Sequence, residues 1–495
     1  MKRLFSVTPV LLYIFSAGLQ AQVEKEELLQ NMELTLEEAI QVSVANNPQV
    51  NRALYSVEDA DQLVKIAYSD VFPNITSSMG YTRNMEIPVS YLPAQIFDPD
   101  ADEGTLVPIP FGTDNNWQGG FTVNQNIFTG EVLVGLSTST VFKTVQQENL
   151  RATTQQVITQ TRIAYYQVLV AREQVLLQEA QINRLEENLR ENRARARAGI
   201  IDEYAVLQLE VQLSNQRPQL IDARYAVNEA YRNLKIALGV PLSLDFEVKG
   251  NLNEFDIVAE DRGGSEENDH IQRIDQMNPY SYQAVEIESL ELTQSRGDLR
   301  VLGANLELKD KEILAIESRF LPTVTATYNL QWSAAEPGMP NFFQNPEPNT
   351  APNRFQTIAV NVNLPIFEGF RRVADVQRAQ IERKDIEEQK RLTQLSAENE
   401  IESAREDLNK AFETAGARKQ ALRQARQGYQ RALRRLETGL GSQIEVTDAE
   451  VQVREAENNY TLMVFEYLSA KAEFDLATGK VPFVDTEIEE MEILE

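Results

Sequence analysis

The chain has 495 residues, with 75 acidic side chains against 47 basic ones and a formal net charge of −28. It has no cysteine and one histidine, His270, which excludes disulfide frameworks, thiolate metal sites, cysteine nucleophiles, a lipidated N-terminal cysteine and multi-histidine metal centres. The acidic excess argues against nucleic acid as a partner, because phosphate binding requires a basic face. The length would allow about three ordinary domains, but 22 glycines and 19 prolines are few for loop-rich domains and predict long uninterrupted elements.

The first 21 residues are typical of an export signal. Lys2 and Arg3 precede a largely apolar stretch from 4 to 19, and Ala21 is the expected cleavage point. A membrane anchor is the alternative, but the apolar run is short and interrupted by polar residues. No later run of 18 apolar residues occurs in the sequence. We therefore expect an exported chain, and any part of it that crosses a membrane is not expected to be helical.

The first repeat, 22–250, begins with two segments of period two, at about 74–84 and 117–128. In each, apolar or aromatic residues alternate with Asn, Gln and Thr, which predicts strands with one apolar and one polar face. Their length suits a tilted strand that crosses a bilayer, and Trp117 lies near a strand end, where interfacial aromatic residues belong. The segment 84–116 between them is expected to be a long outward-facing loop. A soluble antiparallel sheet with one wet face is the alternative that these segments leave open.

A helical hairpin is predicted at about 131–238. Between residues 130 and 199 the chain has no proline and one internal glycine, Gly135, and roughly 65 helical residues would reach about 100 Å. Apolar residues on both arms recur at spacings of three and four, which is typical of helices that supercoil around partners.

The second half repeats the first. An acidic linker, 251–278, precedes a second repeat, 279–480, with strands at about 323–333 and 355–366 and a hairpin at about 370–478; an acidic tail, 481–495, follows. Five landmarks recur in the same order, which indicates an internal duplication. They are Asn47–Pro48 with Asn278–Pro279, Phe72–Pro73 with Phe320–Pro322, Phe128–Gly130 with Phe367–Gly369, Gly199 with Gly439, and Leu238–Gly239 with Thr478–Gly479.

The number of strands has a consequence for assembly. Four strands per chain cannot close a barrel, and lipid does not tolerate an open sheet edge. Strands that span a membrane must therefore be pooled by several chains. A dimer would give eight strands and a packed or very narrow barrel, whereas a trimer would give twelve strands and room for a lumen.

The ordered, duplicated motifs resemble the TolC-like outer-membrane efflux protein family, also called outer membrane factors. The resemblance is carried by Leu34–Ala39, Asn46–Pro48, Phe72–Pro73, Phe128–Gly130, Phe367–Gly369, Gly199 and Gly439. It implies an α+β membrane protein, a homotrimer with a twelve-stranded β-barrel in the lipid of the outer membrane and a long α-helical coiled-coil tunnel in the periplasm.

The same resemblance implies a function without catalytic chemistry or a cofactor. The trimer would dock onto a periplasmic adaptor (membrane fusion) protein and an inner-membrane transporter of the RND or ABC type. It would then be the exit duct of a tripartite efflux pump or a type I secretion system, gated at the periplasmic helix ends.

The hairpin turns are the expected contact sites. In the family these turns close the tunnel and touch the adaptor, so the resemblance makes Gly199, Ile200, Gly439 and Leu440 the adaptor-contact candidates. The alternative is that each glycine only ends its helix in the left-handed conformation. Both interpretations can hold together.

Glu445 and Asp448 lie three positions apart just after the second turn. By position they match the paired acidic residues that ring the family's tunnel entrance, and three chains would place six carboxylates around an aperture that favours cations. Ser442 and Glu445 also have the spacing of a capping box, in which the glutamate bonds back to the cap amide. Asp448 is therefore the better gate candidate. The family's aromatic and arginine lock is not matched, since its places hold Leu436 and Gly441.

Two other functions stay open at this point. An exported coiled-coil structural protein would explain the heptads but not the four alternating segments. An exported carboxylate-based hydrolase would need paired acids in a pocket, whereas most acidic residues here fall on helix faces expected to be solvated.

Overall fold

A computed structural model describes residues 33–252, 295–336 and 353–482. It divides into two compact units, the first drawn from 1–58, 145–304 and 387–495 and the second from 59–144 and 305–386. Each unit takes segments from both halves of the chain, so the compact units do not coincide with the sequence repeats. The expected signal segment, nearly all of the acidic linker and nearly all of the acidic tail lie outside the described residues.

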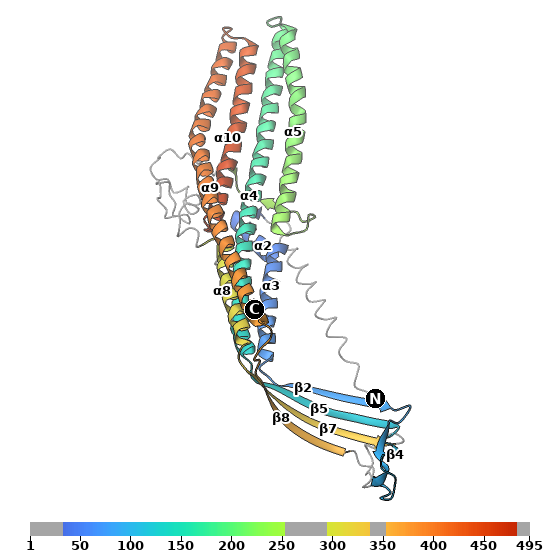
Figure 1. The fold of residues 1–495 in the computed structure, drawn as a ribbon. Coiled ribbons are helices and arrows are strands. Elements are labelled where there is room, and N and C mark those ends of the chain that lie inside the picture. Colours follow the sequence, from blue (N-terminus) through green and yellow to red (C-terminus); the bar gives the residue numbers. More distant parts are fainter. Residues whose placement is uncertain (1–32, 253–294, 337–352, 483–495) are drawn as a thin grey trace. The chain divides into compact units, whose positions relative to one another are not determined.

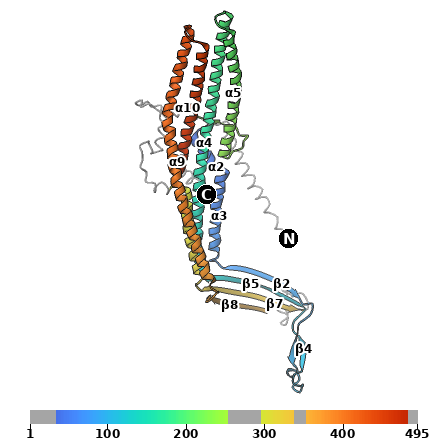
Figure 2. The same ribbon diagram turned by 45° about the horizontal axis from the view of Figure 1, so that its top comes forward.

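Two long helical hairpins supply most of the first unit. Helices α4 (Gly130–Arg197) and α5 (Glu203–Leu238) form one hairpin, and α9 (Arg371–Glu437) and α10 (Gln443–Ala477) form the other. Within this unit they lie side by side in the order α5, α4, α10, α9 (Figures 1 and 2). The long stretches with little glycine and no proline thus fold as the helical arms that the sequence predicts, apart from Pro218, which α5 accommodates.

Apolar residues of both hairpins share one core. Its members include Val168 of α4, Leu234 of α5, Leu408 of α9 and Phe474 of α10, all less than a tenth exposed. Burying a side chain of this size stabilises the fold by about 1.5–3 kcal/mol. The heptad spacing therefore serves to pack the four helices of one chain against one another.

One helix precedes the strands in each half of the chain. These helices are α3 (Pro48–Ser69) and α8 (Gly297–Ser318), and each has 22 residues. Gly297 follows Pro48 by 249 positions, the same offset that separates Pro322 from Pro73. Gly297 therefore begins α8 as Pro48 begins α3, whereas Asn278 and Pro279, the expected match of Asn47–Pro48, lie outside the described residues.

The hairpin ends give the same correspondence. A Cβ atom at Gly239 would lie 2.6 Å from the carbonyl oxygen of Asn46, at the end of α2 (Leu36–Asn46). A Cβ atom at Gly479 would lie 2.5 Å from the carbonyl carbon of Ser295, just before α8. Both glycines have positive φ angles, 71° and 69°. Each therefore allows the end of a hairpin to pack closely against the backbone that leads into the equivalent helix.

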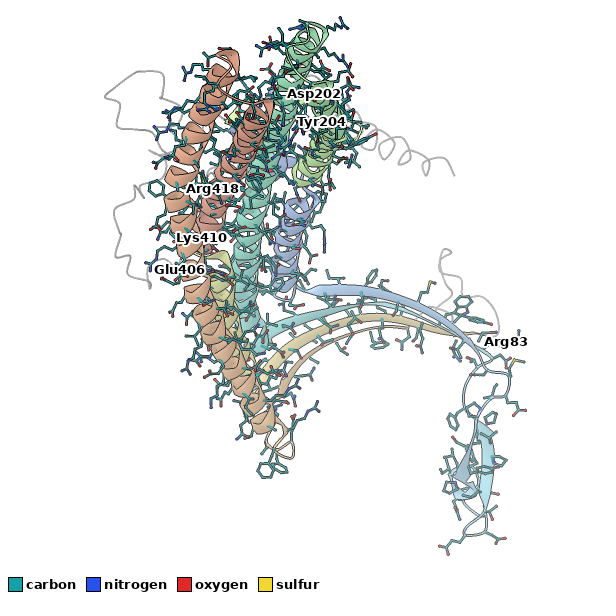
Figure 3. The ribbon with its side chains drawn as sticks, turned by 90° about the horizontal axis from the view of Figure 1, so that it is seen from above. Arg83, Asp202, Tyr204, Glu406, Lys410 and Arg418 are labelled. Carbon is teal, nitrogen blue, oxygen red and sulfur yellow. The ribbon has the colours of Figure 1, made fainter. Side chains whose placement is uncertain are left out.

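A four-stranded antiparallel sheet dominates the second unit. It consists of β2 (Asn74–Arg83), β5 (Asn115–Phe128), β7 (Thr323–Glu336) and β8 (Asn353–Asn363), in the order β2-β5-β7-β8. Arg83 marks the end of β2 in Figure 3. No helix among the described residues is long and apolar enough to cross a membrane.

The register separates the two faces of this sheet. Ile75, Val123, Tyr328 and Ile358 form one row across all four strands. The adjacent row is Thr76, Thr122, Asn329 and Thr357. The alternation seen in each separate segment therefore combines into one apolar and one polar face, as the period of two predicts.

Side-chain contacts match the two faces. On the polar face, Thr122 donates a hydrogen bond to Asn329 at 2.9 Å. On the apolar face, the rings of Tyr81 and Trp117 lie 4.5 Å apart near one end of the strands. The apolar face is nevertheless open, and Ile358 is 79% exposed.

The segment between β2 and β5 is more ordered than the expected loop. It contains β3 (Val89–Pro93) and β4 (Leu106–Pro110), which pair in antiparallel fashion, with the short 3-10 helix η1 (Ala94–Ile96) between them.

In the first unit, β1 (Glu33–Leu34) pairs in parallel with β6 (Glu247–Val248).

Candidate functional site

The first hairpin turn is closed by a glycine in the left-handed conformation. Gly199 has φ 70°, its amide donates to the carbonyl of Ala196, and the amide of Ile200 donates to the carbonyl of Arg195. This pair of bonds is the Schellman arrangement that ends many helices. Asp202 then caps α5 by accepting a hydrogen bond from the amide of Tyr204 at 3.0 Å (Figure 3).

The second turn repeats this geometry. Gly439 has φ 74°, its amide donates to the carbonyl of Leu436, and the amide of Leu440 donates to the carbonyl of Arg435. Ser442 caps α10 by accepting a hydrogen bond from the amide of Glu445. The helix-stop interpretation of both glycines is therefore confirmed. Their role in contacting an adaptor stays a prediction.

Each turn presents one apolar side chain to solvent. Ile200 is 71% exposed and Leu440 is 75% exposed. In a Schellman turn this position commonly packs against an apolar residue one turn earlier, but that place is held here by Arg195 and Arg435. Ile200 and Leu440 are therefore available for contact with another molecule.

Glu445 forms only half of the expected capping box. Its amide bonds to Ser442, but its carboxylate is paired with Arg435, whose Nε lies 3.3 Å from Oε2. Arg435 also donates to the carbonyl of Leu440 at 3.0 Å. The guanidinium, placed at the end of α9, draws the carboxylate across the turn and away from the cap amide.

Asp448 is exposed and makes no ion pair with another described residue. It lies one turn beyond Glu445 on α10, and no cation of the described segments pairs with its carboxylate. Of the two gate candidates, Asp448 is therefore the one with the freely available charge.

Three buried acids on α10 were missed by the sequence reasoning: Asp475, which is 5% exposed, and two acids nearer the second turn. Glu450 is 4% exposed and Glu457 is 8% exposed, although acidic helix residues were expected to form solvated faces. The available signal was their spacing, since Val446, Glu450, Val453 and Glu457 alternate at intervals of four and three and so share one helix face.

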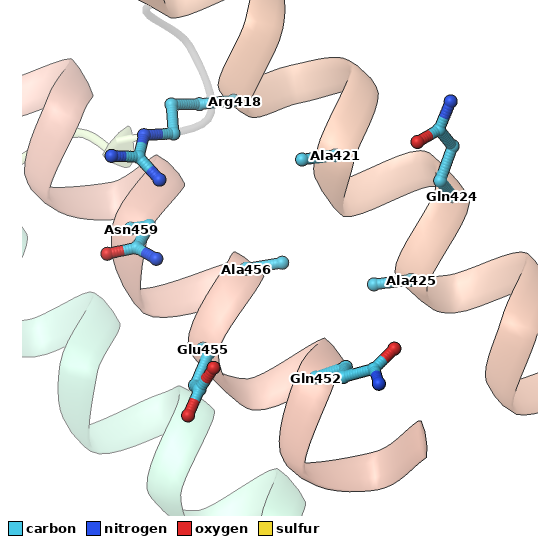
Figure 4. A pocket seen from close by; sticks show the side chains of 8 residues that line it. All are labelled: Arg418, Ala421, Gln424, Ala425, Gln452, Glu455, Ala456 and Asn459. Carbon is cyan, nitrogen blue, oxygen red and sulfur yellow. The ribbon is translucent and has the colours of Figure 1, made fainter. Parts of the chain in front are cut away.

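A groove runs between α9 and α10 with a volume of about 350 Å³. Three alanines, two from α9 and one from α10, point toward one another between the helices, and the other lining side chains are polar (Figure 4). The lining residues are Arg418, Ala421, Gln424, Ala425, Gln452, Glu455, Ala456 and Asn459. No group of His, Asp or Glu side chains suited to holding a metal ion occurs in the described part of the chain.

Comparison with known proteins gives a match to one family. The family of outer membrane efflux proteins matches residues 39–240 and 290–480. The two matched segments correspond to the two halves of the chain, and the second begins close to α8, as the assignment of Gly297 requires. No curated protein matches the chain.

Several solved structures share the fold. The CmeC outer membrane channel of Campylobacter jejuni has a TM-score of 0.67 and 16% identity, covering 92% of this chain and 88% of that one. The open state of the Neisseria gonorrhoeae MtrE outer membrane channel has a TM-score of 0.67 and 16% identity, covering 90% and 88%. The outer membrane protein VceC of Vibrio cholerae has a TM-score of 0.65 and 15% identity, covering 90% and 96%.

The family match extends over most of both halves, and the proteins of similar fold are channels rather than enzymes. A coiled-coil structural protein would not need the two-faced sheet. The chain therefore belongs to the outer membrane efflux protein family and is an efflux protein of the outer membrane.

Proposed function

We propose that three copies of the chain form the outer-membrane exit duct of a tripartite efflux pump or a type I secretion system. The observation that carries this proposal is the pair of free edges of the sheet. Within the described residues, β2 pairs only with β5 and β8 pairs only with β7. An edge strand with open backbone groups pairs readily with another chain, and lipid requires it to be paired.

The strand directions suit closure by identical copies. Neighbouring strands alternate in direction, so β8 of one copy runs antiparallel to β2 of the next copy. Twelve strands from three copies would enclose a lumen, whereas eight strands would leave an interior just wide enough for side chains. The exposed apolar face would meet lipid, and the Thr and Asn face would line water.

The hairpins support the same assembly. An apolar stripe runs along α5 with helical spacing, and each member is more than half exposed: Tyr204, Leu207, Val211, Ile221 and Tyr225. Because α5 and α9 are the outer helices of the row of four, no helix in the described part of the chain covers the stripe on its outer side. A neighbouring copy that places its own α9 against α5 would cover the stripe and continue the row into a tunnel.

The turns are the proposed contact with the rest of the machine. Gly199, Ile200, Gly439 and Leu440 would meet a periplasmic adaptor, which links the duct to an inner-membrane transporter of the RND or ABC type. The exposed apolar side chains at equivalent places of both hairpins support this role. Asp448, with Glu445 beside it, would form the acidic ring at the tunnel entrance.

Bilayer conductance tests the proposal. The full-length protein, solubilised in detergent from the outer-membrane fraction, should migrate as a heat-sensitive trimer and produce uniform single-channel steps in a planar bilayer. The same preparation heated to monomers serves as the matched control and should give no steps. Recovery of the protein wholly from the soluble periplasm, or a native trimer without conductance, would contradict the duct.

A further inference from the structure

A buried polar cluster lies between the two hairpins, within the first unit. Its centre is Glu450 of α10, whose side chain is only 5% exposed, and Glu457 lies two turns further along the same face with 9% exposed. Both acids occupy seam positions between apolar residues, next to Val446 and Val453. The contact of α10 with α4 therefore depends on how these two carboxyl groups are satisfied.

The two acids differ sharply in their partners. Glu457 forms ion pairs with two arginines. Nη2 of Arg426 in α9 lies 2.9 Å from its Oε1, and Nη2 of Arg184 in α4 lies 3.5 Å from its Oε2. For Glu450 the nearest cation is Arg184, with Nε 4.0 Å away, which is too far for a hydrogen bond. The Oε1 atom of Glu450 is buried without a hydrogen-bond partner. One carboxylate is therefore well compensated and the other is not.

Every helix of the row places a polar group near Glu450. Arg454, one turn along α10, donates to Gln216 of α5 at 3.2 Å, and Gln216 in turn bonds to Gln178 of α4. Tyr429 of α9 lies beside Asn188 of α4, and burial together with Glu450 raises the pKa of its hydroxyl. The cations in reach are thus engaged with other groups.

The physical result is a carboxyl group that holds its proton. Burial raises the pKa of Glu450 from 4.5 to about 7, against the opposing effect of Arg184 and Arg454. A protonated carboxyl group has no charge to compensate and can donate a hydrogen bond. The packed arrangement of α10 on α4 is therefore best satisfied when Glu450 is neutral.

We propose that Glu450 is a proton-operated latch between the two hairpins, which holds α10 against α4 when protonated and loosens this contact when it loses its proton. The loosened contact would favour opening at the helix ends. Only this last step rests on the proposed duct function, whereas the latch itself is a property of one chain.

The direction follows from proton linkage. In an arrangement that exposes Glu450, the side chain titrates near its ordinary value of 4.5, whereas the packed arrangement keeps the proton up to about pH 7. Raising the pH across this window favours the loosened arrangement, by up to on the order of 100-fold per chain. Below the window both arrangements hold the proton, and above it both have lost it, so the dependence levels off.

Hydrogen exchange of the full-length protein tests the latch. Glu450→Gln mimics the neutral form and cannot titrate, while Glu455→Gln removes an exposed acid of the same helix and serves as the matched control. Comparing variants at each pH cancels the intrinsic pH dependence of exchange. From about pH 5 to about pH 8, the amides at the start of α10 should lose protection at least tenfold in the native and control proteins relative to Glu450→Gln. Equal pH profiles in all three proteins would overturn the proposal.

A second variant keeps the test sharp if Glu450→Gln folds poorly. Arg184→Gln removes the cation that favours ionisation, so the midpoint of the exchange transition should move to higher pH. The same shift should appear in the infrared band of the protonated carboxyl group. An unchanged or lower midpoint would overturn the latch. The gating role is tested separately by the single-channel open probability of the native trimer. If the exchange transition is found but the open probability does not rise with pH, the latch is supported and its role in gating is overturned.

Discussion

Arg162 of α4 and Asp475 of α10 form an ion pair of 2.7 Å inside the core, with side chains only 6% and 7% exposed. Removing one partner of such a pair leaves an uncompensated buried charge and costs about 3–5 kcal/mol. We expect Arg162→Met to lower the thermal unfolding midpoint of the helical signal strongly, because burial disfavours the Asp475 carboxylate once the guanidinium is gone. The double variant Arg162→Met, Asp475→Leu should recover much of this loss.

An exposed pair provides the control for this prediction. Arg190 and Glu187 are 3.7 Å apart with side chains 80% and 72% exposed, and such pairs contribute about 0–1 kcal/mol. Arg190→Ala should therefore leave the midpoint almost unchanged. If Arg162→Met also leaves the unfolding midpoint almost unchanged, the buried pair does not hold the hairpins together.

Variants of the second turn can separate the stability of the turn from its proposed contact with the adaptor. Gly439→Ala should destabilise the second turn by about 1–2 kcal/mol, because φ 74° is strained for an L residue, although nothing lies within 4 Å of the new Cβ. Leu440→Ser should leave stability unchanged, since Leu440 is 75% exposed, yet it should weaken capture of the adaptor. Thermal unfolding and co-purification of the adaptor from cells measure the two effects. Normal capture by a double variant, Ile200→Ser with Leu440→Ser, would remove both residues from the interface.

The acidic residues at the second turn should contribute unequally to ion selectivity. Asp448→Asn should reduce the cation preference of single channels, because three unpaired carboxylates are lost from the proposed ring. Glu445→Gln should have a smaller effect, because Arg435 already pairs with this carboxylate. Reversal potentials in a salt gradient measure both. The ring would have to be placed elsewhere if the selectivity of Asp448→Asn equals that of the native channel.

Periodicity made much of the fold predictable. The alternation around Ile75 and Val123 predicts which face of a strand each residue occupies. The scarcity of glycine and proline predicts the long helices. The row that joins Ile75 to Ile358 depends on long-range pairing, which no local pattern encodes. The equal length of α3 and α8, 22 residues each, likewise became visible only in the structure.

The candidate site was predictable only in part. Gly199 and Gly439 mark the turns because a left-handed residue favours glycine. Glu450 was overlooked because an acid on a long helix is usually solvated, and its heptad position between Val446 and Val453 was the only local sign of burial. The ion pair of Glu445 with Arg435 forms across a turn, where helical spacing rules no longer apply.

Disulfide crosslinking between strand edges tests the central claim most directly. The chain has no cysteine, so Ser78→Cys in β2 can be combined in turn with Thr357→Cys, Ala359→Cys or Asn361→Cys in β8, all exposed positions on the polar face. Within one copy these edges are three strand spacings apart, about 14 Å, beyond the reach of a disulfide. Single-cysteine variants are the controls.

Three copies that close a barrel should give one outcome in intact cells. At least one of the three combinations should yield covalent dimers and trimers and no larger species, because the third bond closes the ring. Monomers alone in all three combinations, or a ladder that continues beyond the trimer, would contradict the account.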